Sequence, residues 1–87
     1  MSYRIRWSSA ARLAIENTLP EATATAVWKV VNGALAENPH RVGKPLLREL
    51  AGYWSARRGR YRVIYAINDD EIVVTVVAVD HRRDVYR

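Results

Sequence analysis

Arginine, histidine and tyrosine are the residue types that could do chemistry in this sequence, and they gather in two stretches of its second half. The stretches contain Arg57, Arg58, Arg60 and Arg62, then His81, Arg82, Arg83 and Tyr86. Preorganised guanidinium groups stabilise the negative charge that builds on phosphoryl oxygens, and removing one such donor typically costs about 3–4 kcal/mol of transition-state stabilisation. When a ribose 2′-hydroxyl attacks its neighbouring phosphate, the RNA supplies its own nucleophile. The pattern therefore favours metal-free cleavage of RNA.

Several other catalytic patterns are absent from the sequence. It contains no cysteine, no glycine-rich phosphate loop after a strand, no histidine pair at metal spacing and no serine with a recognisable histidine and acid. The acidic run at residues 69–71 could be imagined as a cation site, but a solvated hairpin turn is the favoured interpretation. We therefore expect neither a metal nor a cofactor.

Positive charge is concentrated in the middle of the chain. Residues 40–62 hold seven basic side chains and one acid, Glu49, whereas the first 39 residues hold four basic side chains and three acids. A localised field of this kind attracts a polyanion. It favours nucleic acid over a membrane surface, because the basic cluster does not lie on an amphipathic helix. A solvated basic face is the plainer alternative.

The 87 residues are expected to form one domain of the α+β class. Residues 3–7 alternate as a strand, and a helix follows over residues 10–17. Thr18 and Glu21 fit a capping box for a second helix over residues 19–37. One apolar stripe on that helix is formed by Val27, Val30, Val31, Ala34 and Leu35. The two helices should form an antiparallel hairpin covering one face of a sheet.

The second half of the chain changes to a period of two residues. Residues 40–50 are expected to form an irregular basic loop, residues 53–57 a strand, and residues 61–68 and 72–79 the two strands of a hairpin. In the 61–68 strand, one face would carry Tyr61, Val63, Tyr65 and Ile67, and the other Arg62, Ile64 and Ala66. The predicted fold is a strand, a helix hairpin and a three-stranded antiparallel meander. Its uncovered face would be a concave platform rimmed by arginines.

This topology predicts a site at the open end of the hairpin. If the turn is centred near Asp69, Arg62 lies opposite about Val77. The preceding turn and the C-terminal segment reach the same end. Three segments would then bring together Arg57, Arg62, His81, Arg82 and Tyr86.

A wider set of residues is expected to contact RNA around that site. Its members are Lys44, Arg48, Trp54, Arg58, Arg60, Tyr61 and Arg83. The three rings of Trp54, Tyr61 and Tyr86 lie among basic residues and could stack on exposed bases. For Arg58, Arg60 and Arg83, phosphate anchoring or a surface salt bridge is the simpler role. Tyr65 and Trp28 are expected in the core.

The sequence closely resembles the RelE toxin family of type II toxin–antitoxin systems. The most specific matches are Tyr-Arg-Val-Ile-Tyr at residues 61–65 and His-Arg-Arg-Asp-Val-Tyr at residues 81–86, supported by residues 38–39, 43–46 and 50–52. The resemblance implies the RelE-like microbial RNase fold and a ribosome-dependent mRNA endoribonuclease (mRNA interferase) acting in the ribosomal A site. It also implies a RelB-like antitoxin partner, and operator DNA binding only by the complex with that antitoxin.

The same resemblance implies roles for individual residues. Arg62 and Arg82 correspond to transition-state and proton-transfer arginines, Tyr86 to a tyrosine that stacks on the substrate base, and Arg57 to a phosphate-binding arginine.

One departure concerns the general base. Family members often carry lysines on the strand that here reads Tyr-Trp-Ser-Ala at residues 53–56. Either His81, Arg57 or Lys44 takes their role, or the activity is weak.

Two other functions remain open on the same fold. One is a ParE-type poison of DNA gyrase, and the other is a weak or inactive toxin that serves as a co-repressor with its antitoxin. The longest apolar stretch, near residues 72–79, is far short of the roughly 20 residues that a membrane span needs. We expect a cytoplasmic protein with no membrane partner.

Overall fold

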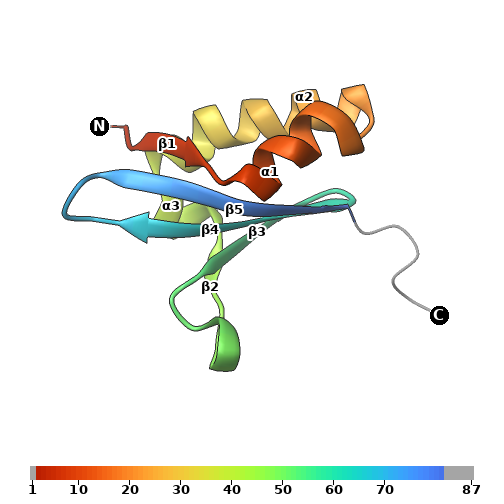
Figure 1. Ribbon diagram of the computed structural model, residues 1–87. Helices are drawn as coiled ribbons and strands as arrows, with labels where there is room; N and C mark the ends of the chain where they lie inside the picture. Colours follow the sequence, from red (N-terminus) through yellow and green to blue (C-terminus); the bar gives the residue numbers. More distant parts are fainter. Residues whose placement is uncertain (1, 82–87) are drawn as a thin grey trace.

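A five-stranded sheet with its helices on one face forms the framework of the chain (Figure 1). The computed structural model describes residues 2–81, with side chains described up to Asp80. The strands lie in the order β1-β5-β4-β3-β2. Their bounds are β1 Arg4–Trp7, β2 Lys44–Pro45, β3 Trp54–Arg58, β4 Tyr61–Asn68 and β5 Val73–His81. The predicted order of strand, helix hairpin and antiparallel meander is confirmed.

Two features of the sheet were not predicted. β1 pairs with β5 in parallel, while β2, β3, β4 and β5 pair antiparallel in succession. The two-residue strand β2 forms an edge and lies where an irregular loop was expected. The short helix α3 (Pro39–Val42) and a 3₁₀ turn (Arg48–Leu50) are part of the same segment. The prediction of an irregular loop over residues 40–50 was therefore wrong at both ends of that stretch and also at β2 in its middle.

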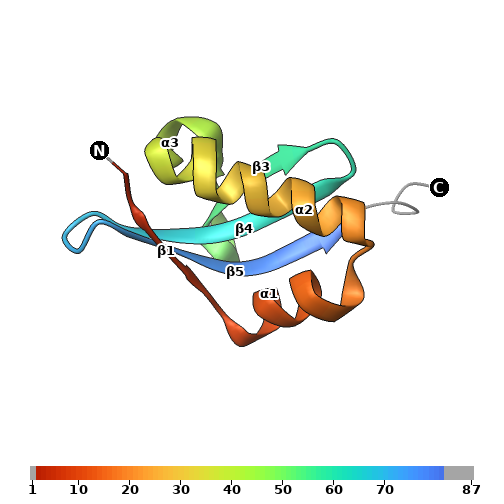
Figure 2. The ribbon, with the colours of Figure 1, turned by 90° about the horizontal axis from the view of Figure 1, so that it is seen from above.

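Each long helix begins as an α-helix and continues as π-helical turns. The first helix comprises α1 Ser9–Leu13 and η1 Ala14–Thr18, and the second comprises α2 Glu21–Val30 and η2 Val31–Leu35. Seen from above, α2 lies over β4, whereas α1 lies beside β5 (Figure 2).

Ser8 starts the first helix and fixes it to the sheet. Its Oγ accepts a hydrogen bond from the Ala11 N–H at 3.0 Å and donates one to the Val77 carbonyl oxygen at 2.7 Å.

The predicted capping box at Thr18 does not form. α2 starts at Glu21 after Pro20, and no side chain caps it. Leu19 is extended, with φ −80° and ψ 148°, because the residue before a proline is driven out of the helical region. Thr18 therefore ends the first helix instead of starting the second.

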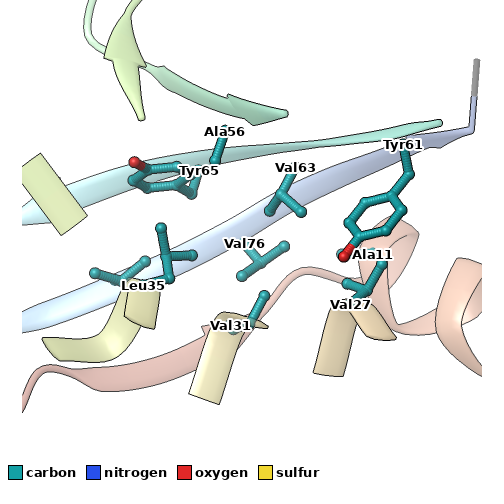
Figure 3. Packing of buried hydrophobic residues seen from close by; sticks show 10 residues of the cluster. Ala11, Val27, Val31, Leu35, Ala56, Tyr61, Val63, Tyr65 and Val76 are labelled. Carbon is teal, nitrogen blue, oxygen red and sulfur yellow. The ribbon is translucent and has the colours of Figure 1, made fainter. Parts of the chain in front are cut away.

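The core lies between the second helix and the sheet (Figure 3). Val27, Val31 and Leu35 of the predicted stripe are fully buried, at a spacing of four residues. Val30 is only partly buried, and the placement of Ala34 in the stripe was wrong, because that residue is exposed. The three buried residues pack in one cluster with Val63 and Tyr65 of the sheet. Burying a valine or leucine side chain stabilises a fold by about 1.5–3 kcal/mol. This short helix stripe is thus a main source of stability.

Of the two aromatic residues expected in the core, Tyr65 is fully buried and Trp28 is not. Trp28 is 52% exposed and stacks on Trp7 with ring centroids 5.6 Å apart.

The register between β4 and β5 differs from the prediction. Arg62 lies opposite Asp80 instead of Val77. The turn covers residues 69–72, so its centre lies later in the chain than predicted. This displacement accounts for two of the three residues by which the partner of Arg62 is shifted. A bulge between Ile64 and Tyr65 adds the last residue of the shift, because Tyr65 pairs with Val76 but Ile64 pairs with Ala78.

Within residues 2–81, no helix has both the length and the apolar character that crossing a membrane requires.

Candidate functional site

The alternation of β4 sorts its side chains between a covered and an open face of the sheet. Tyr61, Val63 and Tyr65 are buried under the helices, whereas Arg62 and Ile64 between them are partly exposed. This is the division that the two-residue period predicts. The open face is therefore the surface on which Arg62 can meet a ligand.

Three charged residues form one row across that face. Arg57 of β3 lies directly opposite Arg62 of β4, and Arg62 lies opposite Asp80 of β5. Arg62 donates a hydrogen bond from Nη2 to Asp80 Oδ2 at 3.4 Å. The side chains are 30% and 60% exposed, so the ion pair contributes only about 0–1 kcal/mol to stability. Arg62 Nε is buried and has no acceptor among the described residues.

A hollow of about 380 Å³ opens beside this row, and we call it the cationic hollow. It is lined by Val42, Gly43, Lys44, Ser55, Arg57 and Arg62. Three of its six lining residues are cationic, and none is acidic. Asp80, the one carboxylate of the row, pairs with Arg62 but does not line the hollow. The hollow consequently presents net positive charge and hydrogen-bond donors, which suits an anion such as a phosphate.

Lys44 reaches the hollow because β2 is held close to β3. Lys44 pairs with Ser55, two residues before Arg57. The neighbouring Gly43 packs so tightly that an added Cβ would overlap the Tyr65 hydroxyl and lie 2.7 Å from the Ser55 carbonyl oxygen. Only glycine fits this approach without displacing β2.

The buried hydroxyl of Tyr65 also holds the segment that leads into β2. It donates a hydrogen bond to the Pro39 carbonyl oxygen at 2.7 Å. Burial raises the pKa of Tyr65 to about 12, although the Gly43 backbone and the charge of Arg58 act in the opposite direction. The Gly43–Tyr65 contact was not predicted. The two residues lie on segments that are far apart in the sequence, and no local pattern around Gly43 indicates that it packs against Tyr65.

The other arginines expected to bind RNA do not line the hollow. Arg58 lies opposite Tyr61 and donates from Nη1 to its neighbour's carbonyl oxygen, that of Arg57, at 3.1 Å. Arg60 lies in the turn between β3 and β4, and Arg48 lies in the 3₁₀ turn with φ 61°. All three are exposed.

Two of the rings expected to stack on bases lie on the covered side. Trp54 stacks on Tyr65 with centroids 6.5 Å apart and meets the edge of His40 at 5.4 Å. Tyr61 is only 7% exposed and belongs to the core (Figure 3). Neither ring faces the cationic hollow, because both occupy the strand positions that alternate with Ser55 and Arg62.

The C-terminal part of the predicted site lies outside the described residues. It comprises Arg82, Arg83 and Tyr86, and the side chain of His81 is likewise not described. The backbone of β5 ends at His81, opposite Tyr61. The roles assigned to these residues stay predictions.

A second polar cluster lies at the opposite end of the hairpin. Asp69 accepts a hydrogen bond from the Tyr3 hydroxyl at 2.6 Å and lies 3.1 Å from His40 Nε2. The hydrogen bond from Tyr3 is the main reason that the pKa of Asp69 is lowered, and His40 adds to the effect. The cluster joins the residue before β1, helix α3 and the turn after β4, and it gives a structural role to one acidic residue of that turn.

Three comparisons place the chain among known proteins. A sequence model described as "ParE toxin of type II toxin-antitoxin system, parDE" matches residues 3–86. Toxin RelG of Mycobacterium tuberculosis is 47% identical over 87 residues, which cover 100% of this chain and 99% of RelG. Toxin RelE of the same organism is 49% identical over 69 residues, which cover 79% of this chain and 71% of RelE.

The fold comparison agrees with the sequence matches. A chain from the crystal structure of the RelBE2 toxin–antitoxin complex of M. tuberculosis superposes with a TM-score of 0.90 and 45% sequence identity. The match covers 94% of this chain and 100% of that one. The resemblance expected from the sequence is therefore confirmed over nearly the whole domain.

Proposed function

Because the chain belongs to the family of ParE and RelE toxins of type II toxin–antitoxin systems, we propose that it is a ribosome-dependent mRNA endoribonuclease. A RelB-like antitoxin would hold it inactive. Its substrate would be messenger RNA in the ribosomal A site.

The cationic hollow is the observation that carries this proposal. Arg57 and Arg62 lie directly opposite each other on one face of an antiparallel pair. Like charges directly opposite each other destabilise a sheet. Lys44 lines the same hollow and increases the repulsion. A bound phosphate would offset part of this positive charge, which would explain why a protein retains an arrangement that is unfavourable for folding alone.

The proposed reaction needs only the RNA and side chains. The 2′-oxygen forms a bond to phosphorus while the bond from phosphorus to the 5′-oxygen breaks, leaving a 2′,3′-cyclic phosphate and a 5′-hydroxyl. One proton leaves the 2′-hydroxyl and another reaches the departing oxygen. Arg57 and Arg62 would stabilise the charge on the phosphoryl oxygens. Arg82 would hydrogen-bond the departing 5′-oxygen while a proton from solvent reaches it, and Tyr86 would stack on the adjacent base.

Lys44 is the favoured general base of the three candidates. It lines the same hollow as Arg62, whereas the side chain of His81 is not described. The guanidinium of Arg57 offers only hydrogen-bond donors, so it has no atom with which to accept the proton of the 2′-hydroxyl.

The partner would be an antitoxin of the RelB type. The similar M. tuberculosis structure is described as a toxin–antitoxin complex. The superposition covers 100% of the matched chain of that complex. The complex, but not the toxin alone, would bind operator DNA.

Growth arrest and transcript-end mapping after induction test the proposal. We expect arrest and cuts within translated codons, and Arg62→Ala or Arg57→Ala should relieve both. Arg12→Ala is the matched control, because it removes an exposed arginine from α1, on the helical layer.

Two results would contradict the nuclease. Arrest with intact mRNA and accumulated double-strand DNA breaks would indicate a gyrase poison, which the ParE description of the matching family keeps open. Absence of arrest, together with operator binding by the antitoxin complex, would indicate a co-repressor.

A further inference from the structure

A second hollow on the open face of the sheet is apolar, and we call it the apolar hollow. It has a volume of about 340 Å³ and is lined by Leu50, Tyr53, Ile64, Val77 and Ala78. Leu50 is 51% and Tyr53 36% exposed. Exposed apolar groups gathered in one place on a small domain generally mark a binding surface. The proposed reaction does not use any of these residues.

The apolar hollow and the cationic hollow adjoin each other. Ile64 follows Arg62 by two residues on β4, and Tyr53 precedes Ser55 by two residues, so each pair shares a face. Two residues along a strand span roughly 7 Å. Ser55 of the cationic hollow also pairs directly with Ile64 of the apolar one. A single ligand with a charged and an apolar part could therefore occupy both.

We propose that the apolar hollow binds a nucleobase of an RNA whose phosphate occupies the cationic hollow, with Tyr53 as the stacking platform. The inference rests on the proposed function, since it assumes that the ligand is RNA. Proteins that bind single-stranded RNA combine a basic groove for the backbone with aromatic rings on which unstacked bases lie. Tyr53 is the aromatic residue that lines this hollow, and the cations line the adjoining cationic hollow.

The size of the hollow favours a base over a protein segment. A stable protein interface buries about 800 Å² on each partner, formed by some 20–30 residues. The apolar hollow is formed by five residues, which is enough for one ring system. Binding of a base would also be tolerant of its identity, because every base has a π-face.

Tyr53 can be replaced without disturbing the backbone around it. Its N–H donates to the Leu50 carbonyl oxygen at 3.1 Å, and its carbonyl oxygen accepts from the Leu46 N–H at 2.8 Å. Both bonds involve the main chain alone. Circular dichroism should therefore show folded protein for Tyr53→Ala, Tyr53→Leu and Tyr53→Phe.

The test compares two RNA ligands by fluorescence anisotropy with the full chain at fixed salt. One is a short single-stranded oligonucleotide whose 2′-oxygens are methylated, so that it cannot be cleaved. The other has the same backbone with one base removed. We expect the wild type to bind the first more tightly by about 5- to 150-fold, which corresponds to a stacking energy of 1–3 kcal/mol per base.

The variants then assign the preference to Tyr53. Tyr53→Ala should bind both ligands equally, at the wild-type affinity for the abasic one. Tyr53→Phe should keep the preference, and Tyr53→Leu should lose most of it, because leucine is apolar but offers no ring. Leu13→Ala, which truncates a 56% exposed side chain on the helical layer, should change nothing.

Three outcomes would overturn the inference. Equal affinity of the wild type for both ligands would exclude the base site while leaving the phosphate site in place. Loss of antitoxin binding by Tyr53→Ala with an unchanged preference for the base would show that the hollow receives the antitoxin. If neither RNA binds even at low salt, the proposed function fails together with this inference.

Discussion

Replacing Gly43 with alanine should displace the strand that carries Lys44. The added Cβ would overlap the Tyr65 hydroxyl and lie 2.7 Å from the Ser55 carbonyl oxygen, whereas ordinary contacts begin at 3.4 Å. Restoring an ordinary contact with the Ser55 oxygen requires a shift of about 0.7 Å, the difference between these two distances, and we expect β2 to make it. Overpacking of a tight site typically costs about 1–3 kcal/mol of folding free energy. The melting temperature of a domain of this size should fall by roughly 4–8 °C for each kcal/mol.

Thermal unfolding and RNA affinity measure the two consequences. Gly43→Ala should lower both, because Lys44 moves away from the Arg57 and Arg62 guanidiniums. Gly33→Ala is the matched control, since its added Cβ meets no atom within 4 Å. In a helical turn that substitution should stabilise the protein by about 0.5–1 kcal/mol.

A double variant identifies the contact responsible. With Tyr65→Phe in the same chain, the hydroxyl that the new Cβ overlaps is gone, so the two changes should destabilise by less than their sum. Relief should be partial, because the Ser55 carbonyl oxygen remains. If Gly43→Ala melts like the wild type and binds RNA equally well, the tight approach of β2 does not position Lys44 and the reasoning is refuted.

Three further predictions concern Tyr65, Asp69 and Arg57. Tyr65→Phe should cost about 1–3 kcal/mol at neutral pH, because the buried Pro39 carbonyl oxygen loses its donor. Since the pKa of Tyr65 is raised to about 12 in the fold, wild-type stability should decline as the pH rises from about 10 towards 12, and urea unfolding should show a smaller decline for the variant. Asp69 has its pKa lowered in the fold, so the stability it contributes is present above its ordinary value of 3.8 and is lost as the pH falls through the lowered one. Asp69→Asn should therefore lose less stability than the wild type on acidification below about pH 4, and an identical acid profile would exclude a role for the Tyr3 hydrogen bond. RNA affinity should fall steeply with salt, and Arg57→Ala should reduce the slope of log affinity against log salt by about 0.7–1, whereas an unchanged slope would remove Arg57 from the phosphate contacts.

Local patterns in the sequence were enough to predict the order of the elements and the face on which Arg62 lies. The period of a strand depends only on its own backbone, so Tyr61, Val63 and Tyr65 had to share a face and Arg62 had to take the other. The helical stripe of Val27, Val31 and Leu35 was readable for the same reason. Resemblance to a known family added the C-terminal residues Arg82, Arg83 and Tyr86, whose roles stay predictions.

Contacts between distant segments were decided by the tertiary structure alone. The register that places Asp80 opposite Arg62 depends on a bulge in the middle of the hairpin, and no local pattern marks that bulge. Lys44 enters the cationic hollow because Gly43 packs against Tyr65, 22 residues along the chain. Period and propensity act over a few neighbouring residues, whereas register and close packing depend on what each segment meets in the folded chain. The sequence alone therefore determined which side chains could bind a phosphate. The tertiary structure determined which of them lie together in the cationic hollow.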